Sequence, residues 1–271
     1  MKNILFLSCL LFMACNRSEQ AAQTQLEQVQ QLYENNQFNV AKQKMDELKS
    51  NYPTAYATQK EALALRRRIE LKEQERNLLF CDSLLPVCIK EVEKIKQNFV
   101  FEKKEYDPAG QYTAKCWDPE TTGNYLQTTV NEAGKIIFTS VYQSNRPLKH
   151  NQIKLAIASG EYIETQTVPY DGGLNYRFRD TFGNCYEYVS FSNGRDNGAV
   201  AFIYQNAASK ISLQYLGGTS QPTRILSEKE KKVIIEVCNL ASILSEINQL
   251  QQEKIKAEKR IAYLHDKLKK L

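Results

Sequence analysis

The sequence has few of the residues from which catalytic and metal sites are built. It contains two histidines, His150 and His265, and one tryptophan. No cysteine pair follows the CxxC spacing of zinc and redox sites. None of the motifs GxSxG, HExxH, GxGxxG or the phosphate-binding loop occurs. We therefore expect no enzyme activity, no bound metal and no cofactor.

Long apolar runs and dense charge are also missing. After the first 20 residues, no segment is an uninterrupted apolar run of the roughly 20 residues that cross a bilayer. The 36 Lys and Arg residues slightly outnumber the 31 Asp and Glu residues, and they form no dense basic tract. This balance argues against nucleic acid as a partner.

The N-terminus carries the most specific signal in the chain. Lys2 precedes the apolar stretch Ile4–Met13, and the chain turns polar directly after Ala14 and Cys15. This pattern is typical of a signal peptide, here residues 1–14. The Ala-Cys junction resembles the lipobox of bacterial lipoproteins, with Phe12 in place of the usual aliphatic residue. The resemblance implies cleavage by the type II signal peptidase and a diacylglyceryl group on Cys15.

A lipid on Cys15 implies that the mature chain is held at a membrane, because two or more acyl chains give stable attachment. Asn16 follows the cysteine, where an aspartate favours inner-membrane retention in enterobacterial lipoproteins. We therefore expect an envelope protein at the outer membrane, tethered by residues 15–24. The alternatives are an ordinary secretory signal cut elsewhere and a buried N-terminal helix.

Five cysteines follow Cys15, and an odd number leaves at least one free or paired between chains. We expect most of them to be small buried apolar residues.

Residues 25–99 are predicted to be helical. Glycine is absent between Ala21 and Phe99, and apolar residues recur at three-four spacing. Asn35-Asn36 and Pro53 break the pattern into successive helices. Asp82-Ser83 is predicted to cap a fourth helix, with Pro86 in its first turn.

The segment Leu32–Pro53 resembles a tetratricopeptide unit. Phe38, Ala41, Met45 and Pro53 lie near that family's aromatic, small, bulky and helix-ending positions. The resemblance covers one repeat, and it implies a concave surface that binds another protein. The alternative is a helical pair that packs on the chain's own sheet.

Residues 100–218 change to alternating polarity, with short turn segments between apolar runs. Short links make neighbouring strands antiparallel, so we predict an up-and-down β-meander of about eight strands. The alternation also predicts one dry face and one wet face. The expected strands are 124–130, 135–143, 152–158, 161–169, 175–181, 185–191, 199–205 and 210–216.

Residues 225–271 are predicted to form one long, coiled-coil-like helix. Ser227 and Glu230 have the spacing of a capping box. Apolar residues then alternate at steps of three and four, with Lys254 as one polar interruption. The second half needs a partner helix, either from the same chain, which we favour, or from a second copy.

Aromatic residues are the candidates for ligand binding. Eleven of the 15 tyrosines lie between Glu105 and Tyr215. We expect four of them to share one sheet face opposite two arginines, and a fifth to lie in the turn-rich segment Val168–Asp180. The alternative is that strands simply favour aromatic residues. The five tyrosines are Tyr170, Tyr176, Tyr186, Tyr188 and Tyr204, and the arginines are Arg177 and Arg179.

Catalytic groups are weaker candidates. His150 is expected at a turn between strands, as a surface or cap residue. Carboxylates from Asp171, Asp180, Glu187 and Asp196 could converge as in glycoside hydrolysis, although turn roles explain Asp171 and Asp196.

The whole layout is an α+β fold that resembles uncharacterised lipoproteins of Bacteroides-like bacteria, a resemblance that implies no activity. We expect a lipid-anchored, non-enzymatic interaction or scaffold module that binds a protein partner or a second copy. The alternative is a lipoprotein whose β-meander binds a lipid, glycan or peptide, and a hydrolase comes third.

Overall fold

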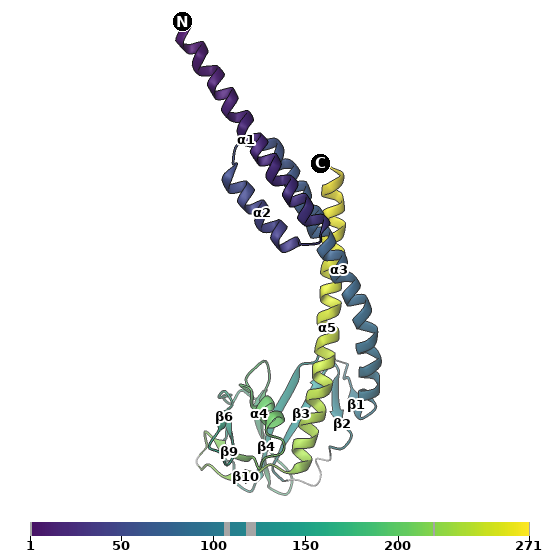
Figure 1. Cartoon of the computed structure of the whole chain (residues 1–271). Helices are drawn as coiled ribbons and strands as arrows, with labels where there is room; N and C mark the ends of the chain where they lie inside the picture. Colours follow the sequence, from purple (N-terminus) through teal and green to yellow (C-terminus); the bar gives the residue numbers. More distant parts are fainter. Residues whose placement is uncertain (1, 106–108, 118–122, 219, 271) are drawn as a thin grey trace. The chain divides into compact units, whose positions relative to one another are not determined.

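The computed structural model describes residues 2–105, 109–117, 123–218 and 220–270, and for residues 2–16 it describes the backbone alone. The chain divides into two compact units, which we call the helical unit (Met1–Leu84 with Gln251–Leu271) and the sheet unit (Leu85–Leu250). The predicted α+β class is confirmed: helices come first, antiparallel sheets follow and one long helix ends the chain (Figure 1).

The helical unit begins with the hairpin of α1 (Lys2–Glu34) and α2 (Phe38–Asn51). The predicted break at Asn35-Asn36 is confirmed, and Asn36 has a positive φ of 59°. Apolar residues of α1, α2 and the start of α3 (Tyr56–Lys96) form one core. Its buried members are Leu26, Val29, Phe38, Ala41, Met45, Leu48, Ala62, Leu65 and Ile69.

Glu19 of α1 fixes the start of α3. Its carboxylate accepts hydrogen bonds from Thr58 N at 2.8 Å and Thr58 Oγ1 at 2.7 Å. A carboxylate is favourable there, because the first N–H groups of a helix lack partners within the helix. The side chain of Cys15 lies outside the part of the chain whose side chains are described, so its lipidation stays a prediction.

The predicted fourth helix is wrong, because α3 continues through Pro86 without a break. Proline costs a helix roughly 3 kcal/mol, since it lacks an N–H and its ring meets the preceding turn. The apolar residues Cys81, Cys88 and Val92 are buried on either side of it. This packing keeps the segment helical.

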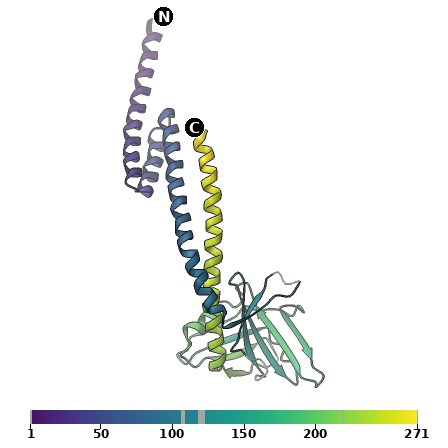
Figure 2. The ribbon, with the colours of Figure 1, turned by 90° about the vertical axis from the view of Figure 1, so that its right-hand side faces the viewer.

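The long helix α5 (Glu228–Lys269) finds its partner helix within the same chain, the alternative that we favoured. In the helical unit, Arg260 donates to both oxygens of Glu70 at 2.6 and 2.9 Å. Lys254, the polar interruption of the apolar seam, bonds Asp82 at 2.6 Å. Figure 2 shows α3 and α5 side by side in this region.

The strands of the sheet unit form two antiparallel sheets rather than one meander. The six-stranded sheet has the order β1-β2-β3-β4-β8-β7, and the four-stranded sheet has the order β10-β9-β5-β6. The bounds are β1 Phe99–Glu102, β2 Gln111–Ala114, β3 Tyr125–Asn131, β4 Ile136–Ser144, β5 Gln152–Ala156, β6 Tyr162–Glu164, β7 Asn175–Arg179, β8 Cys185–Phe191, β9 Ser212–Leu216 and β10 Thr223–Ile225.

The strand predicted at 199–205 is wrong, since these residues form the helix α4 (Ala199–Gln205). Its buried residues, Ala199, Val200 and Ile203, have helical spacing and not the alternation of a strand. Gly198 precedes the helix with a φ of 87°, a conformation that glycine adopts without strain.

The core of the sheet unit lies between the two sheets and beneath α5. Phe138, Leu155, Phe191 and Leu213 are buried in it together with Ile234 of α5. By length and composition α5 is the one helix in the described residues that could cross a membrane. Core helices meet the same criterion, and Val233, Val237 and Leu240 of α5 are buried against the sheet residue Val130.

Candidate functional site

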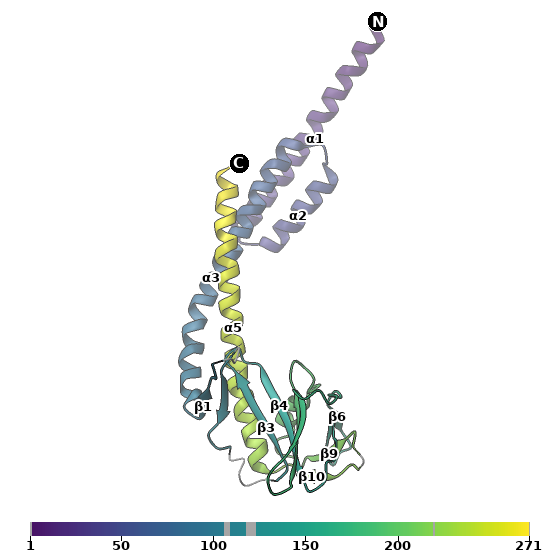
Figure 3. The ribbon, with the colours of Figure 1, turned by 180° about the vertical axis from the view of Figure 1, so that it is seen from behind.

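The six-stranded sheet has an inner face, which packs on α5 and the second sheet, and an outer face on its opposite side, seen from behind in Figure 3. On the outer face, Tyr176 and Phe178 of β7 lie opposite Tyr188 and Tyr186 of β8. The rings of Tyr176 and Tyr188 are parallel within 1° at 4.9 Å, and those of Phe178 and Tyr186 lie within 11° at 5.0 Å. We call these four residues the aromatic ladder.

Neighbouring strands continue the aromatic ladder. The Tyr188 hydroxyl is hydrogen-bonded to that of Tyr125 on β3, and Tyr186 accepts a hydrogen bond from Gln143 Nε2 at 2.9 Å. The Tyr125 ring in turn contacts Trp117, with centroids 5.2 Å apart. Burial, followed by the neighbouring Tyr125, raises the pKa of Tyr188 to about 12, so these phenols stay neutral at physiological pH.

The rest of the outer face on β2, β3, β4 and β8 carries no charged strand residue. Its side chains are aliphatic, amide or hydroxyl groups, and most are half-exposed. Glu102 on β1, at the far edge of the sheet, is the one charged residue that faces this way among the described strands. The amide and hydroxyl residues are Gln111, Thr113, Gln127, Thr129, Asn131, Thr139, Gln143 and Ser190.

The structure brings together three of the five predicted tyrosines, namely Tyr176, Tyr186 and Tyr188. Tyr170 lies apart from the ladder, where the guanidinium of Arg177 stacks 4.7 Å from its ring. The expectation that Tyr204 shares the sheet face is wrong, because it lies on α4, where its hydroxyl donates to Asn239 at 3.2 Å. Phe178 completes the ladder, and its period-two spacing from Tyr176 is the signal that could have identified it.

The inner face holds a buried polar cluster. His150 and Glu187 are both fully buried, and His150 Nδ1 lies 2.9 Å from Glu187 Oε2. The backbone N–H of Lys149 donates to the same carboxylate at 2.7 Å, and His150 Nε2 lies 3.2 Å from Ser140 Oγ. The prediction that His150 is a surface or cap residue is therefore wrong.

The surroundings of Glu187 keep it charged. Burial opposes its ionisation, but hydrogen bonds from His150 and from the backbone outweigh burial and lower its pKa. Arg177 adds a more distant cation, with Nε 3.7 Å from the carboxylate. This cluster is packed beneath the rings of Tyr142 and Tyr215, so it holds the sheets together and offers no open position to a substrate.

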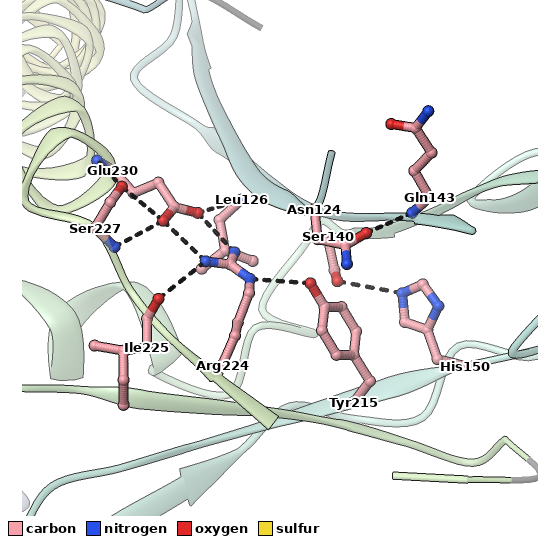
Figure 4. A network of polar contacts seen from close by, with 10 residues as sticks. All are labelled: Asn124, Leu126, Ser140, Gln143, His150, Tyr215, Arg224, Ile225, Ser227 and Glu230. Carbon is pink, nitrogen blue, oxygen red and sulfur yellow. Dashed lines mark hydrogen bonds and ion pairs between the residues drawn. The ribbon is translucent and has the colours of Figure 1, made fainter. Parts of the chain in front are cut away.

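A second buried cluster joins α5 to both sheets (Figure 4). Arg224 donates to both oxygens of Glu230, at 2.9 and 2.6 Å, and to the hydroxyl of Tyr215 at 3.1 Å. Glu230 also accepts from Ser227 N at 2.9 Å, and Ser227 Oγ accepts from Glu230 N at 3.2 Å. The predicted capping box is thus confirmed, and its carboxylate is shared with the half-buried Arg224.

Glu230 also completes the sheet. It accepts a hydrogen bond from Leu126 N of β3 at 2.9 Å. The residues of β3 that pair with β2 are Val130 and Asn131, so Leu126 lies beyond that pairing. The carboxylate therefore takes the position that the carbonyl of a neighbouring strand otherwise occupies.

The predicted carboxylates do not share one site. Asp171 accepts from Gly173 N and Asn175 N, and Asp180 accepts from Phe182 N and Asn184 N, so each closes a turn at its own end of β7. The backbone hydrogen bonds lower the pKa of Asp171, and a hydrogen bond from the Asn184 side chain at 2.9 Å, followed by the backbone ones, lowers that of Asp180. The turn role predicted for Asp171 is confirmed.

The helical unit has a groove of about 390 Å³ between α2 and α3. Leu63, which is 47% exposed, is the exposed apolar residue of its lining, and the core residues Met45, Leu48 and Ala62 form its floor. Three cationic residues, Lys49, Lys60 and Arg66, line the same groove. Arg66 also pairs with Asp46 at 2.6 Å.

The sheet unit has a hollow of about 490 Å³ between α4 and α5, which Tyr204 and Cys238 line. Burial, followed by Asp196, raises the pKa of Cys238 to about 11, so its thiol is unreactive at neutral pH. The five cysteines with described side chains are all unpaired, and three of them are buried. The expectation of small buried residues is therefore confirmed for Cys81, Cys88 and Cys185.

No protein-family model, no curated protein and no solved structure matches the chain. The site therefore has to be interpreted from its own geometry.

Proposed function

We propose that the chain is a lipid-anchored protein of the cell envelope that acts as a non-enzymatic interaction module. Cys15 carries the lipid and holds the protein at the membrane, with the outer membrane as the favoured location. The helical unit supplies the surface that recognises a partner protein.

The observation that carries this proposal is the groove between α2 and α3. Its apolar surface and its cationic residues Lys49 and Lys60 fit an amphipathic segment with an apolar side and carboxylates beside it. Apolar contact supplies affinity, and the cations favour acidic partners over basic ones. The tetratricopeptide-like residues Phe38, Ala41 and Met45 lie in the core under α2, where they hold the groove in place.

Site-specific crosslinking in intact cells tests the groove. A photoreactive amino acid at Leu63 should capture one reproducible protein, and adding Lys49→Glu and Lys60→Glu should reduce capture several-fold. The matched control is the same photoreactive residue at Leu79, which is 69% exposed on α3 and does not line the groove. Equal capture from both positions, or none from Leu63, would contradict the proposal.

The anchor has its own test. Cys15→Ala should abolish fatty-acid labelling and release the protein from membranes, whereas Cys81→Ala should leave labelling intact. Labelling that survives in Cys15→Ala would refute the assignment of the lipid to this residue.

The aromatic ladder favours a second candidate, a lipoprotein that binds a ligand. Phe138, Leu155, Phe191 and Leu213 fill the space between the two sheets, so a ligand would bind on the outside. In this second candidate function, the ligand would bind at the aromatic ladder.

A further inference from the structure

We propose that the outer face of the six-stranded sheet is a binding platform for an extended, uncharged glycan chain. The platform belongs to the sheet unit and uses none of the groove residues of the helical unit. It goes beyond the proposed protein interaction, and the two can fail separately.

The first argument is charge. A quarter of the residues of the whole chain are charged, yet the strands β2, β3, β4, β7 and β8 present no charged side chain to this face. Arg177 and Glu187, which lie on two of the same strands, both belong to the inner face. The Asp180 carboxylate, directly after β7, is a charged group beside the ladder, because it is hydrogen-bonded to Tyr186. A single carboxylate gives no array of charges for a polycation and repels a polyanion, whereas it can accept a hydrogen bond from a sugar hydroxyl. A neutral ligand is therefore the best match.

The second argument is the geometry of the aromatic ladder. Inside the ladder the rings cover one another, because Tyr176 and Tyr188 are parallel at 4.9 Å. β7 is the edge strand of the six-stranded sheet, so Tyr176 and Phe178 each have one ring face without a further ladder ring against it. Phe178 is 46% exposed. The free ring face at the β7 edge suits the apolar C–H face of a sugar ring.

The third argument is the polar part of the platform. Beside the ladder, Gln143 and Ser190 are half-exposed, and Gln127, Gln111 and Thr113 continue the polar surface across β3 and β2. Amides and hydroxyls both donate and accept hydrogen bonds, as the hydroxyls of a sugar require. Gln143, Ser190 and Gln111 each make one hydrogen bond within the sheet and keep further donor or acceptor capacity. A lipid chain cannot use this remaining capacity, and covering it without a partner costs free energy.

The shape of the platform favours an extended chain over a single sugar. The described outer face is a sheet surface several strands wide, and the apolar part and the polar part lie side by side on it. Each contact with a single sugar on an open surface is weak, so affinity has to come from several sugar units of one glycan chain. We therefore expect affinity to rise with oligosaccharide length.

Trp117 supplies the readout. It is the one tryptophan of the sequence, and its ring lies 5.2 Å from Tyr125, which is bonded to the ladder through Tyr188. The experiment titrates the chain from residue 16 onward with β-linked glucose, xylose, mannose and N-acetylglucosamine oligomers of two to six sugars. Tryptophan emission and isothermal calorimetry follow binding.

We expect saturable binding of at least one neutral series, tightening with length and little changed between 50 and 500 mM salt. Phe178→Ala should weaken binding about tenfold, as loss of one stacked aromatic contact implies. Tyr204→Ala is the matched control, because Tyr204 is also 46% exposed but lies on α4. It should bind as tightly as the unmodified chain.

Four results would overturn the proposal. The first is the absence of binding to every neutral series at 10 mM sugar. The second is an equal loss of glycan affinity in Phe178→Ala and Tyr204→Ala. The third is preferential, salt-sensitive binding of polygalacturonate or DNA. A protein captured in cells through Phe178 in place of a glycan would assign the face to a protein partner and would also overturn it.

Discussion

The two faces of the six-stranded sheet are built from the same strands and differ in almost every property. On β8, Glu187, Val189 and Phe191 turn inward and are buried, while Tyr186 and Tyr188 turn outward and stay half-exposed. The inner face buries charged groups and pairs them, whereas the strand residues of the outer face on β2, β3, β4, β7 and β8 are uncharged. The Asp180 carboxylate, directly after β7, bonds the outward-facing Tyr186. In the six-stranded sheet, buried charge therefore serves to hold the layers together, and the strand residues that face outward are almost all neutral.

This comparison explains why the buried clusters are poor candidates for catalysis. Each buried charge has a partner that fixes it: His150 holds Glu187, and Arg224 holds Glu230. Burying a charge is costly unless hydrogen bonds compensate it, so such pairs mark positions where the fold demands one arrangement.

The largest expected effect on stability comes from breaking the cluster of Arg224, Glu230 and Tyr215, which joins α5 to both sheets. Glu230→Ala should lower the free energy of unfolding by about 4 kcal/mol, because the half-buried Arg224 loses its carboxylate and Leu126 N loses its acceptor. Urea denaturation followed by circular dichroism measures it. Glu228→Ala, in the same helical turn with a side chain that is 87% exposed, should cost less than about 1 kcal/mol. Similar losses in the two variants would show that the network does not stabilise the layers.

The next effect concerns the turn that brings the sheet onto α5. Gly134 has a φ of 78°, and an added Cβ would lie 2.5 Å from Ser245 N and 2.6 Å from Ala241 O of the helix. Gly134→Ala should therefore destabilise by about 3 kcal/mol, from backbone strain and overpacking together.

Gly172→Ala is the matched control for this close approach. Gly172 has a similar φ of 76°, but a Cβ there meets nothing within 4 Å. Only the strain of the left-handed conformation remains, about 1 kcal/mol. Equal thermal shifts in the two alanine variants would mean that the turn does not pack on α5.

A smaller effect should appear on acidification. The pKa values of Glu187 and Glu230 are lowered in the folded protein, while in the unfolded chain both titrate near the ordinary value, about 4.3. The stability that the two carboxylates contribute is complete above the unfolded pKa, and it is lost as the pH falls through the lower pKa of the folded state. Denaturation from pH 7 to pH 3 should show falling stability, with a shallower fall in Glu187→Gln. An unchanged slope in this variant would contradict the buried ionised carboxylate.

The smallest effect belongs to the outer face. Phe178→Ala should cost less than about 1 kcal/mol of stability, because the ring is 46% exposed and fills no enclosed space. Phe191→Ala, on the inner face at 1% exposure, should cost about 4 kcal/mol. A large loss from Phe178→Ala would show that the ladder is structural and would weaken its assignment as a binding surface.

Local patterns in the sequence predicted the elements that depend on local rules. The break at Asn35-Asn36, the capping box of Ser227 and Glu230, and the alternation in β8 all follow from neighbouring residues. The same local rules gave wrong predictions at Pro86 and at α4. Packing of Cys81, Cys88 and Val92 overrode the proline, and the short apolar run Ala199–Gln205 fits a strand or a buried helix equally well.

The candidate site was predictable in part. Tyr176, Tyr186 and Tyr188 were identified because alternation places them on one face, and the register of β7 against β8 then aligned them. The division into two sheets was not predictable, because it depends on pairing between β4 and β8, which are more than 40 residues apart in sequence. The same pairing, with the turn at Lys149, brings Glu187 to His150. No pattern of neighbouring residues predicts the contact between Glu187 and His150.

The hydrogen bond from Leu126 N to Glu230 has a consequence for hydrogen–deuterium exchange. The amide of a strand residue normally exchanges when its neighbouring strand separates, but this amide is protected by a side chain of α5. Its exchange rate therefore reports how often the helix lifts from the sheet, while amides bonded between β3 and β4 report opening of the sheet itself. Mass spectrometry of one peptide that spans β3 can thus time two separate openings in the same molecule.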